Sequence, residues 1–196
     1  MLEICDLCKV LSNPLRLELL AHIYQTKDGC NFGYLVDKMQ ESKLYEPGLC
    51  SSGVSQYLRE LVRINIVRRH RDGCYTNYHT DLSHAPKSIA EITALIIKRM
   101  PKDTNRDFAR VFPALMNPFR ATVVRMLAKS GPLSAGIICE KTKHQSIHLH
   151  RDLKPALNAR LIAETHLSKV EIIYHYIQPI DPIIVCIMNH LLAPTT

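Results

Sequence analysis

The sequence predicts a mainly α-helical protein with two small β-hairpins, built as two similar domains of residues 1–100 and 101–196. Two internal matches and one turn support this fold class. LSNPLRLELLAHI at 11–23 resembles LMNPFRATVVRML at 115–127, and SQYLRELVRINIVRR at 55–69 aligns without gaps with HRDLKPALNARLIAE at 150–164. Asp72 and Gly73 stand between two extended runs, which is a strong hairpin signal. A chain of 196 residues is long enough for two domains of about 100 residues each.

Each copy starts a helix at an Asn-Pro pair. Asn13 and Asn117 suit the N-cap position, because the side-chain oxygen accepts a hydrogen bond from a free backbone N–H group. Pro14 and Pro118 follow at the first helical position, where the missing N–H costs nothing. The apolar residues that follow have helical spacing in both copies, so we expect helices over 13–27 and 117–129.

The second match predicts a helix followed by a strand. We expect Ser51 or Ser52 to cap a helix that ends near Asn65, because Asn tolerates the left-handed conformation found at many helix ends. The offset between the copies falls from 104 to 95, so the first copy holds nine extra residues. We expect them in the loop around 40–53.

The expected elements follow the same order in both copies. The first copy has helices at 2–11, 13–27, 32–40 and 51–65, a hairpin at 66–79 and a helix at 87–100. The second has helices at 106–116, 117–129, 134–141 and 145–158, a hairpin at 161–177 and a helix at 182–192, with the join near 101–103. This order is typical of a winged helix-turn-helix domain, here present in tandem.

The stretch from 54 to 79 resembles the ArsR family of bacterial winged-helix repressors. Its hairpin is basic with a Gly turn, as in that family, and the matching recognition-helix residues are Val54, Ser55, Leu58 and Leu61. Tyr57 replaces the usual His, and Asn65 replaces the usual Gly. The resemblance covers 5–98 well and 108–192 more weakly.

Family members are usually homodimers that pair through their first and last helices. The resemblance therefore implies that this one chain carries both halves, as an intramolecular pseudo-dimer. The last helix supports this expectation, because 183–191 is apolar on nearly all sides and needs to be buried. We expect it to pack against the 87–100 helix and the two N-terminal helices.

The resemblance and the net charge of +7 predict a sequence-specific DNA-binding transcriptional regulator that acts as a repressor on double-stranded DNA. Helices 51–63 and 145–157 would enter successive major grooves, while the basic hairpin contacts phosphates. In the first copy the expected DNA-binding residues are Ser51, Ser52, Ser55, Gln56, Arg59, Arg68, Arg69 and Arg71. In the second copy they are Gln145, Ser146, His148, His150, Arg151 and Lys154, although Asp152 beside them would repel phosphate.

The sequence predicts no cofactor site. Three groups of residues are nevertheless candidates for binding a metal or for reacting with a thiol-reactive effector. Cys5 and Cys8 are spaced to bind a soft metal, although two small residues packing in a helix seam explain them more simply. Cys50 precedes the recognition helix and could carry a reactive thiol that controls DNA binding. His144 and His148 could share a metal, or bind phosphate.

Two other function classes compete with this one. A winged-helix module that binds protein, with a degenerate DNA face, is the alternative to a DNA-binding regulator. An enzyme is not expected, because the chain has seven glycines and neither a phosphate-binding Gly loop nor a nucleophile elbow. Seven cysteines without a disulfide or zinc spacing favour reduced thiols in the cytoplasm, and no apolar run reaches the length of a membrane span.

Overall fold

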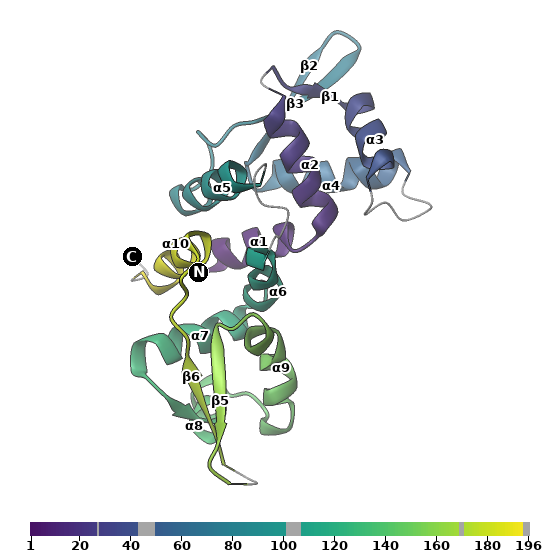
Figure 1. The fold of residues 1–196 in the computed structure, drawn as a ribbon. Helices are drawn as coiled ribbons and strands as arrows, with labels where there is room; N and C mark the ends of the chain where they lie inside the picture. The colour runs from purple at the N-terminus through teal and green to yellow at the C-terminus, as the bar shows by residue number, and fades with distance from the viewer. Residues whose placement is uncertain (27, 43–49, 101–106, 169–170, 194–196) are drawn as a thin grey trace. The chain divides into compact units, whose positions relative to one another are not determined.

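The computed structural model describes residues 1–26, 28–42, 50–100, 107–168 and 171–193. The chain divides into two compact units (Figure 1). The N-terminal unit comprises residues 10–106, and the C-terminal unit comprises residues 1–9 together with 107–196. The division near residue 106 is close to the expected one, whereas residues 1–9 group with the C-terminal unit instead of the first copy. One contact within this unit is the hydrogen bond that the Thr122 hydroxyl donates to the sulfur of Met1 at 3.8 Å.

The N-terminal unit contains four complete helices and one three-stranded antiparallel sheet among its described residues. The first helix, α1 (Leu2–Leu11), ends in this unit. It is followed by α2 (Pro14–Gln25), β1 (Cys30–Asn31), α3 (Phe32–Glu41), α4 (Ser51–Arg63), β2 (Val67–Asp72), β3 (Tyr75–Thr80) and α5 (Lys87–Arg99). The strand order is β1-β3-β2, so the central strand β3 pairs with both others.

The C-terminal unit repeats this order of elements. A 3-10 turn (Asp107–Arg110) leads into α6 (Val111–Leu115), α7 (Pro118–Ser130), β4 (Leu133–Ser134), α8 (Ala135–Thr142), α9 (Ser146–Asn158), β5 (Ile162–His166), β6 (Ile172–Tyr176) and α10 (Pro182–Leu192). Its strand order, β4-β6-β5, again places the returning strand of the hairpin in the centre. Mainly helical structure with small antiparallel hairpins is thus confirmed.

Three local expectations need correction. Cys50, and neither Ser51 nor Ser52, occupies the N-cap of α4, and its side chain makes no capping hydrogen bond. The helix expected over 106–116 starts with a 3-10 turn, and its α-helical part is only five residues long. The two-residue strands β1 and β4 were not foreseen, because such a short strand has no periodicity of its own and exists only by pairing with β3 or β6.

The Asn-Pro helix starts are confirmed. The Asn13 side-chain oxygen accepts from the backbone N of Leu15 at 2.9 Å, and that of Asn117 accepts from the backbone N of Phe119 at 2.9 Å. Each proline is the first residue of its helix. The loop expected to hold the extra residues and the join near 101–103 lie largely or wholly outside the described residues.

The arginine that follows each Asn-Pro pair has a structural role that the sequence did not reveal. Arg16 donates from Nη1 to the carbonyl of Val10 at 3.2 Å. Arg120, which is 8% exposed, donates to the carbonyls of Ala114 at 2.9 Å and Pro113 at 2.7 Å. Both arginines therefore satisfy carbonyl groups at the end of the preceding helix, which otherwise have no intrahelical partner.

The chain leaves α4 and α9 through the same backbone geometry. Asn65 has a φ of 57° and Arg160 a φ of 54°, both in the left-handed region. Two hydrogen bonds close each turn: Asn65 N to Val62 O and Ile66 N to Leu61 O in one unit, and Arg160 N to Leu157 O and Leu161 N to Ala156 O in the other. The expected left-handed Asn65 is confirmed, and this turn fixes the direction in which each hairpin leaves its helix.

The apolar core of each unit includes the buried side of α4 or α9 and the central strand of the hairpin that follows. Tyr78 on β3 and Tyr174 on β6 occupy matching positions on the central strands, and they are 7% and 1% exposed. The apolar α10 is buried on one side, through Ile183, Ile187 and Leu191. In the part of the chain that the structure describes, no helix has both the length and the apolar character required to cross a bilayer.

Candidate nucleic-acid interface

Helix α4 presents a polar stripe to solvent and an apolar stripe to the core. Val54, Leu58 and Leu61 are buried. The exposed residues, spaced three or four apart on the opposite side, are Ser52, Gln56, Arg59 and Arg63. Ser51 is exposed at the helix start, and Ser55 is half-buried on the flank. The structure thus places four of the five predicted α4 residues at the surface.

Cross-strand pairing divides the basic hairpin into two faces. Arg69 stands opposite Tyr78, and Arg71 stands opposite Thr76. Because directly opposed residues point to the same side of a sheet, both arginines share the side of the buried Tyr78. Arg68 directly precedes Arg69 in the strand, stands opposite His79, and points to the opposite side.

Arg68 forms an ion pair on that opposite side. Its Nη1 lies 3.2 Å from Asp81 Oδ2, and its Nη2 lies 3.4 Å from His84 Nε2. Hydrogen bonds from Ser83, together with the Arg68 charge, lower the pKa of Asp81 below its ordinary value. The sequence grouped Arg68, Arg69 and Arg71 as one phosphate-binding cluster. The structure separates Arg68 from the other two, because alternate residues of a strand face opposite ways.

The remaining arginines differ in whether they have an intramolecular partner. Arg63 pairs with Glu60 at 3.1 Å on the helix surface. Arg59, Arg69 and Arg71 are exposed, and their side chains make no ion pair or hydrogen bond with the residues that the structure describes. These three arginines and the polar stripe of α4 form what we call the basic face. Their charges are available to an external anion.

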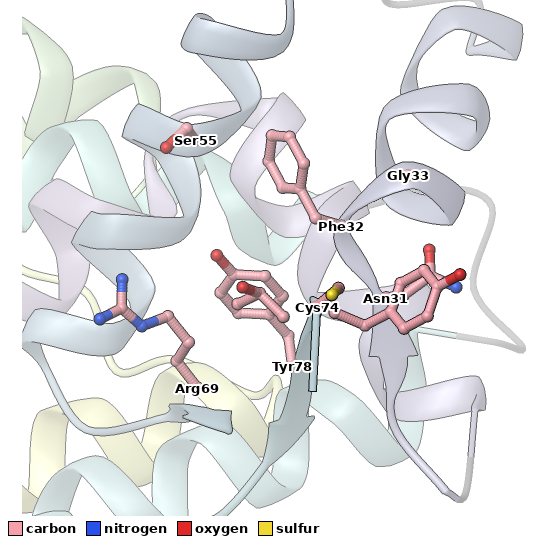
Figure 2. Close-up of a pocket in the computed structure, with 9 residues that line it drawn as sticks. Asn31, Phe32, Gly33, Ser55, Arg69, Cys74 and Tyr78 are labelled. Carbon is pink, nitrogen blue, oxygen red and sulfur yellow. The ribbon is translucent and has the colours of Figure 1, made fainter. Parts of the chain in front are cut away.

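A pocket of about 480 Å³ lies within the N-terminal unit, between the start of α3, α4 and the hairpin. Figure 2 shows side chains from all three elements around it. They include Asn31, Gly33, Ser55, Arg69, Thr76 and Tyr78. Tyr78 and Asn31 were not foreseen as site residues. The turn at Gly73, which puts position 69 opposite 78, was the signal that could have identified Tyr78.

In the C-terminal unit, α9 has the same two stripes. Leu149, Leu153 and Ala156 are buried. The exposed side carries Ile147, Arg151, Lys154 and Asn158, with Gln145 and Ser146 exposed at the helix start and His148 half-buried. Ile147 is 81% exposed at the position that Ser52 occupies on α4. The surface of α9 is therefore less polar than that of α4.

Most charges around α9 are paired within the unit. His150 Nδ1 lies 3.1 Å from Glu164 Oε2, and Arg151 Nε lies 3.3 Å from Asp152 Oδ1. Burial alone would raise the pKa of Asp152, but hydrogen bonds from Arg151 and His144 outweigh it and hold the pKa below its ordinary value. The ion pair between Arg151 and Asp152 reduces the repulsion that Asp152 would exert on a DNA phosphate. It also compensates the positive charge of Arg151, which is then less available to bind phosphate.

The proposed histidine pair does not share a helix face. His144 precedes the first residue of α9, and its ring stacks on Phe119 with centroids 4.1 Å apart. Its Nε2 lies 3.0 Å from Asp152 Oδ2. The i, i+4 spacing with His148 therefore does not describe two ligands on one helix, and His144 is held by other partners.

The cysteines differ in exposure. Cys5 and Cys8 are buried, and burial raises the pKa of both thiols, which disfavours the thiolate that a soft metal needs. Cys50 is exposed, with Sγ 2.8 Å from Ser52 Oγ. Hydrogen bonds from the Ser52 side chain and from backbone groups lower the pKa of Cys50.

The hairpins of the two units differ at one equivalent pair. Arg69 opposes Tyr78 in the N-terminal unit, whereas Glu164 opposes Tyr174 in the C-terminal unit. The pair therefore carries opposite charges in the two units. Comparisons with family models, with curated proteins and with solved structures give no match for this chain.

Proposed function

We propose that the chain is a cytoplasmic, sequence-specific DNA-binding regulator that represses transcription, built from two winged helix-turn-helix domains in tandem. One observation carries the proposal: the exposed polar stripe of α4, and three arginines whose side chains have no partner among the described residues, lie on the elements that a winged helix uses to bind DNA. The ArsR-like motif residues belong to these same elements. A charged surface without internal partners suits a polyanion.

The dimensions of α4 suit the major groove. It is 13 residues long, and a groove about 12 Å wide admits one helix. Gln56 lies in the middle of the exposed stripe, and a Gln amide can form two hydrogen bonds with adenine. Arg69 and Arg71 are well suited to contact phosphates beside this groove, where they add affinity without reading sequence.

The C-terminal unit is proposed to supply the second half of the pseudo-dimer. The repeated order of elements, the matched helix starts and the matched left-handed turns support a tandem origin. We propose that the units pair through their first and last helices and that α9 enters a second major groove. Because Arg151 and His150 already have acidic partners, α9 would bind more weakly and at an unlike half-site.

A protein-binding module is the second candidate for the chain, and the surface of the C-terminal unit is what favours it. Ile147 and Leu167 are 81% and 59% exposed, on the helix and hairpin that would otherwise face DNA. Glu164 replaces the arginine of the first hairpin. Exposed apolar side chains beside acidic ones suit a protein surface better than a phosphate backbone.

Duplex binding measured at a series of salt concentrations separates the two candidates. The full chain is titrated with a mixed-sequence duplex and followed by fluorescence anisotropy. A DNA-binding regulator gives a log affinity that falls steeply with log salt concentration, whereas a protein-binding module gives a slope near zero. Selection of bound sequences, with and without zinc and reductant, then tests for specificity and for an effector.

A further inference from the structure

We propose that the pocket between α3, α4 and the hairpin anchors one backbone phosphate of the duplex, held by the Tyr78 hydroxyl, the Arg69 guanidinium and the start of α3. This inference rests on the proposed DNA-binding function and adds to it a single, built position for the phosphate. The site belongs to the N-terminal unit alone, so it sets which half of the protein fixes the register on DNA.

Tyr78 is the first reason. Its side chain is 7% exposed, yet it lines the pocket, and its hydroxyl makes no hydrogen bond with any other residue in the described ranges. The hydroxyl is not one of the described polar atoms that are sealed from solvent without a partner, so it opens to the pocket, where it can take a partner. An oxygen from outside, placed in the pocket, would provide one.

Arg69 is the second reason. It is the cross-strand neighbour of Tyr78 and lines the same pocket (Figure 2). It has no ion pair among the described residues, whereas its sequence neighbour Arg68 is paired with Asp81. Burial raises the pKa of Tyr78 and the Arg69 charge opposes this only in part, so the hydroxyl remains a neutral donor. One cation and one neutral donor beside it match the needs of a phosphodiester.

The start of α3 completes the site. Asn31 caps this ten-residue helix by accepting from the backbone N of Tyr34 at 2.8 Å, and the next two residues, Phe32 and Gly33, line the pocket. The first turn of a helix carries free N–H groups and the positive end of the helix dipole, both of which favour an anion. The three donors come from three elements, as expected of a site that fixes position.

The C-terminal unit provides an internal comparison. Tyr174 matches Tyr78 on the central strand, but Glu164 occupies the place of Arg69. A carboxylate at that position repels phosphate. The same fold therefore carries the anchor in one unit and lacks it in the other.

The test is a phosphate-by-phosphate scan of a bound duplex. Single methylphosphonates, which remove one backbone charge each, are placed along the selected sequence, and the affinities of the full-length wild type and Tyr78→Phe are compared. We expect Tyr78→Phe to bind about fivefold more weakly. At one phosphate position the methylphosphonate should lower the affinity of the wild type severalfold and leave the affinity of Tyr78→Phe unchanged. Tyr174→Phe is the matched control and should respond as the wild type does.

Arg69→Met gives a second, independent readout if Tyr78→Phe loses structure, because Arg69 is exposed and its replacement does not disturb the core. The affinity of Arg69→Met should also be unaffected by a methylphosphonate at that same phosphate position. A wild type that binds no duplex overturns the proposed function along with the anchor. If the wild type binds the duplex and each methylphosphonate changes the affinity equally in the wild type and in all variants, only the phosphate anchor is overturned.

Discussion

The division of the hairpin into two faces leads to a sharp prediction about its arginines. Arg69 and Arg71 point to one side and have no partner within the part of the chain that the structure describes, while Arg68 points to the other side and is paired with Asp81 at 3.2 Å. Replacing Arg69 and Arg71 together by Ala should therefore weaken DNA binding. Replacing Arg68 by Ala, which removes the same kind of charge from the same strand, should have little effect.

The expected magnitude follows from counterion release. Each lost phosphate contact reduces the slope of log affinity against log salt by about 0.9, which corresponds to about an eightfold loss of affinity at 0.1 M salt. The double variant should thus lose about sixtyfold at 0.1 M, with the slope lowered by about 1.8. The loss should be similar for specific and random sequences, because phosphate contacts carry no sequence information.

Fluorescence anisotropy titrations at four or more salt concentrations measure both quantities. Arg68→Ala should stay within about twofold of the wild type and keep its slope, since its charge is already compensated. Thermal unfolding should be nearly unchanged in all variants, because the three side chains are exposed. An equal loss of slope in Arg68→Ala, or an unchanged slope in the double variant, would refute the assignment of faces.

Three further outcomes are expected. Gln56→Ala should relax specificity at one base pair, with discrimination there reduced by about 1–3 kcal/mol in a selection experiment and little change for random duplex. Asn13→Ala and Asn117→Ala should each lower the free energy of unfolding by about 1 kcal/mol in urea titrations, since each removes an observed N-cap. Burial raises the pKa of Tyr174 from 10.0 to about 12, so stability should hold below pH 10.0 and fall as the pH rises toward 12. Tyr174→Phe should lack this fall in urea titrations across that pH range.

Much of the local structure could be predicted because its causes are local. The Asn-Pro pairs specify where α2 and α7 begin, since the cap and the first helical residue are neighbours in sequence. The Gly73 turn and the left-handed Asn65 follow from backbone preferences of single residues. The strands β1 and β4 could not be predicted in this way, because two residues form a strand only when a distant partner is present.

The candidate site was only partly predictable. The exposed stripe of α4 follows from helical spacing, so Gln56 and Arg59 were placed correctly at the surface. The pairing of His150 with Glu164 was not foreseen, since it joins a helix to a strand fourteen positions away. Such contacts depend on how helix and hairpin pack, which composition and periodicity do not specify.

By itself, the sequence determined the order of helices and hairpins, their starts and turns, and the sides of each helix that face the core. These features depend on interactions within a few residues. Only the tertiary structure decided which charges are compensated, which arginines share a face with Tyr78, and where residues 1–9 pack. Those outcomes depend on atoms brought together from distant parts of the chain, where strand register and side-chain direction determine which groups come within reach.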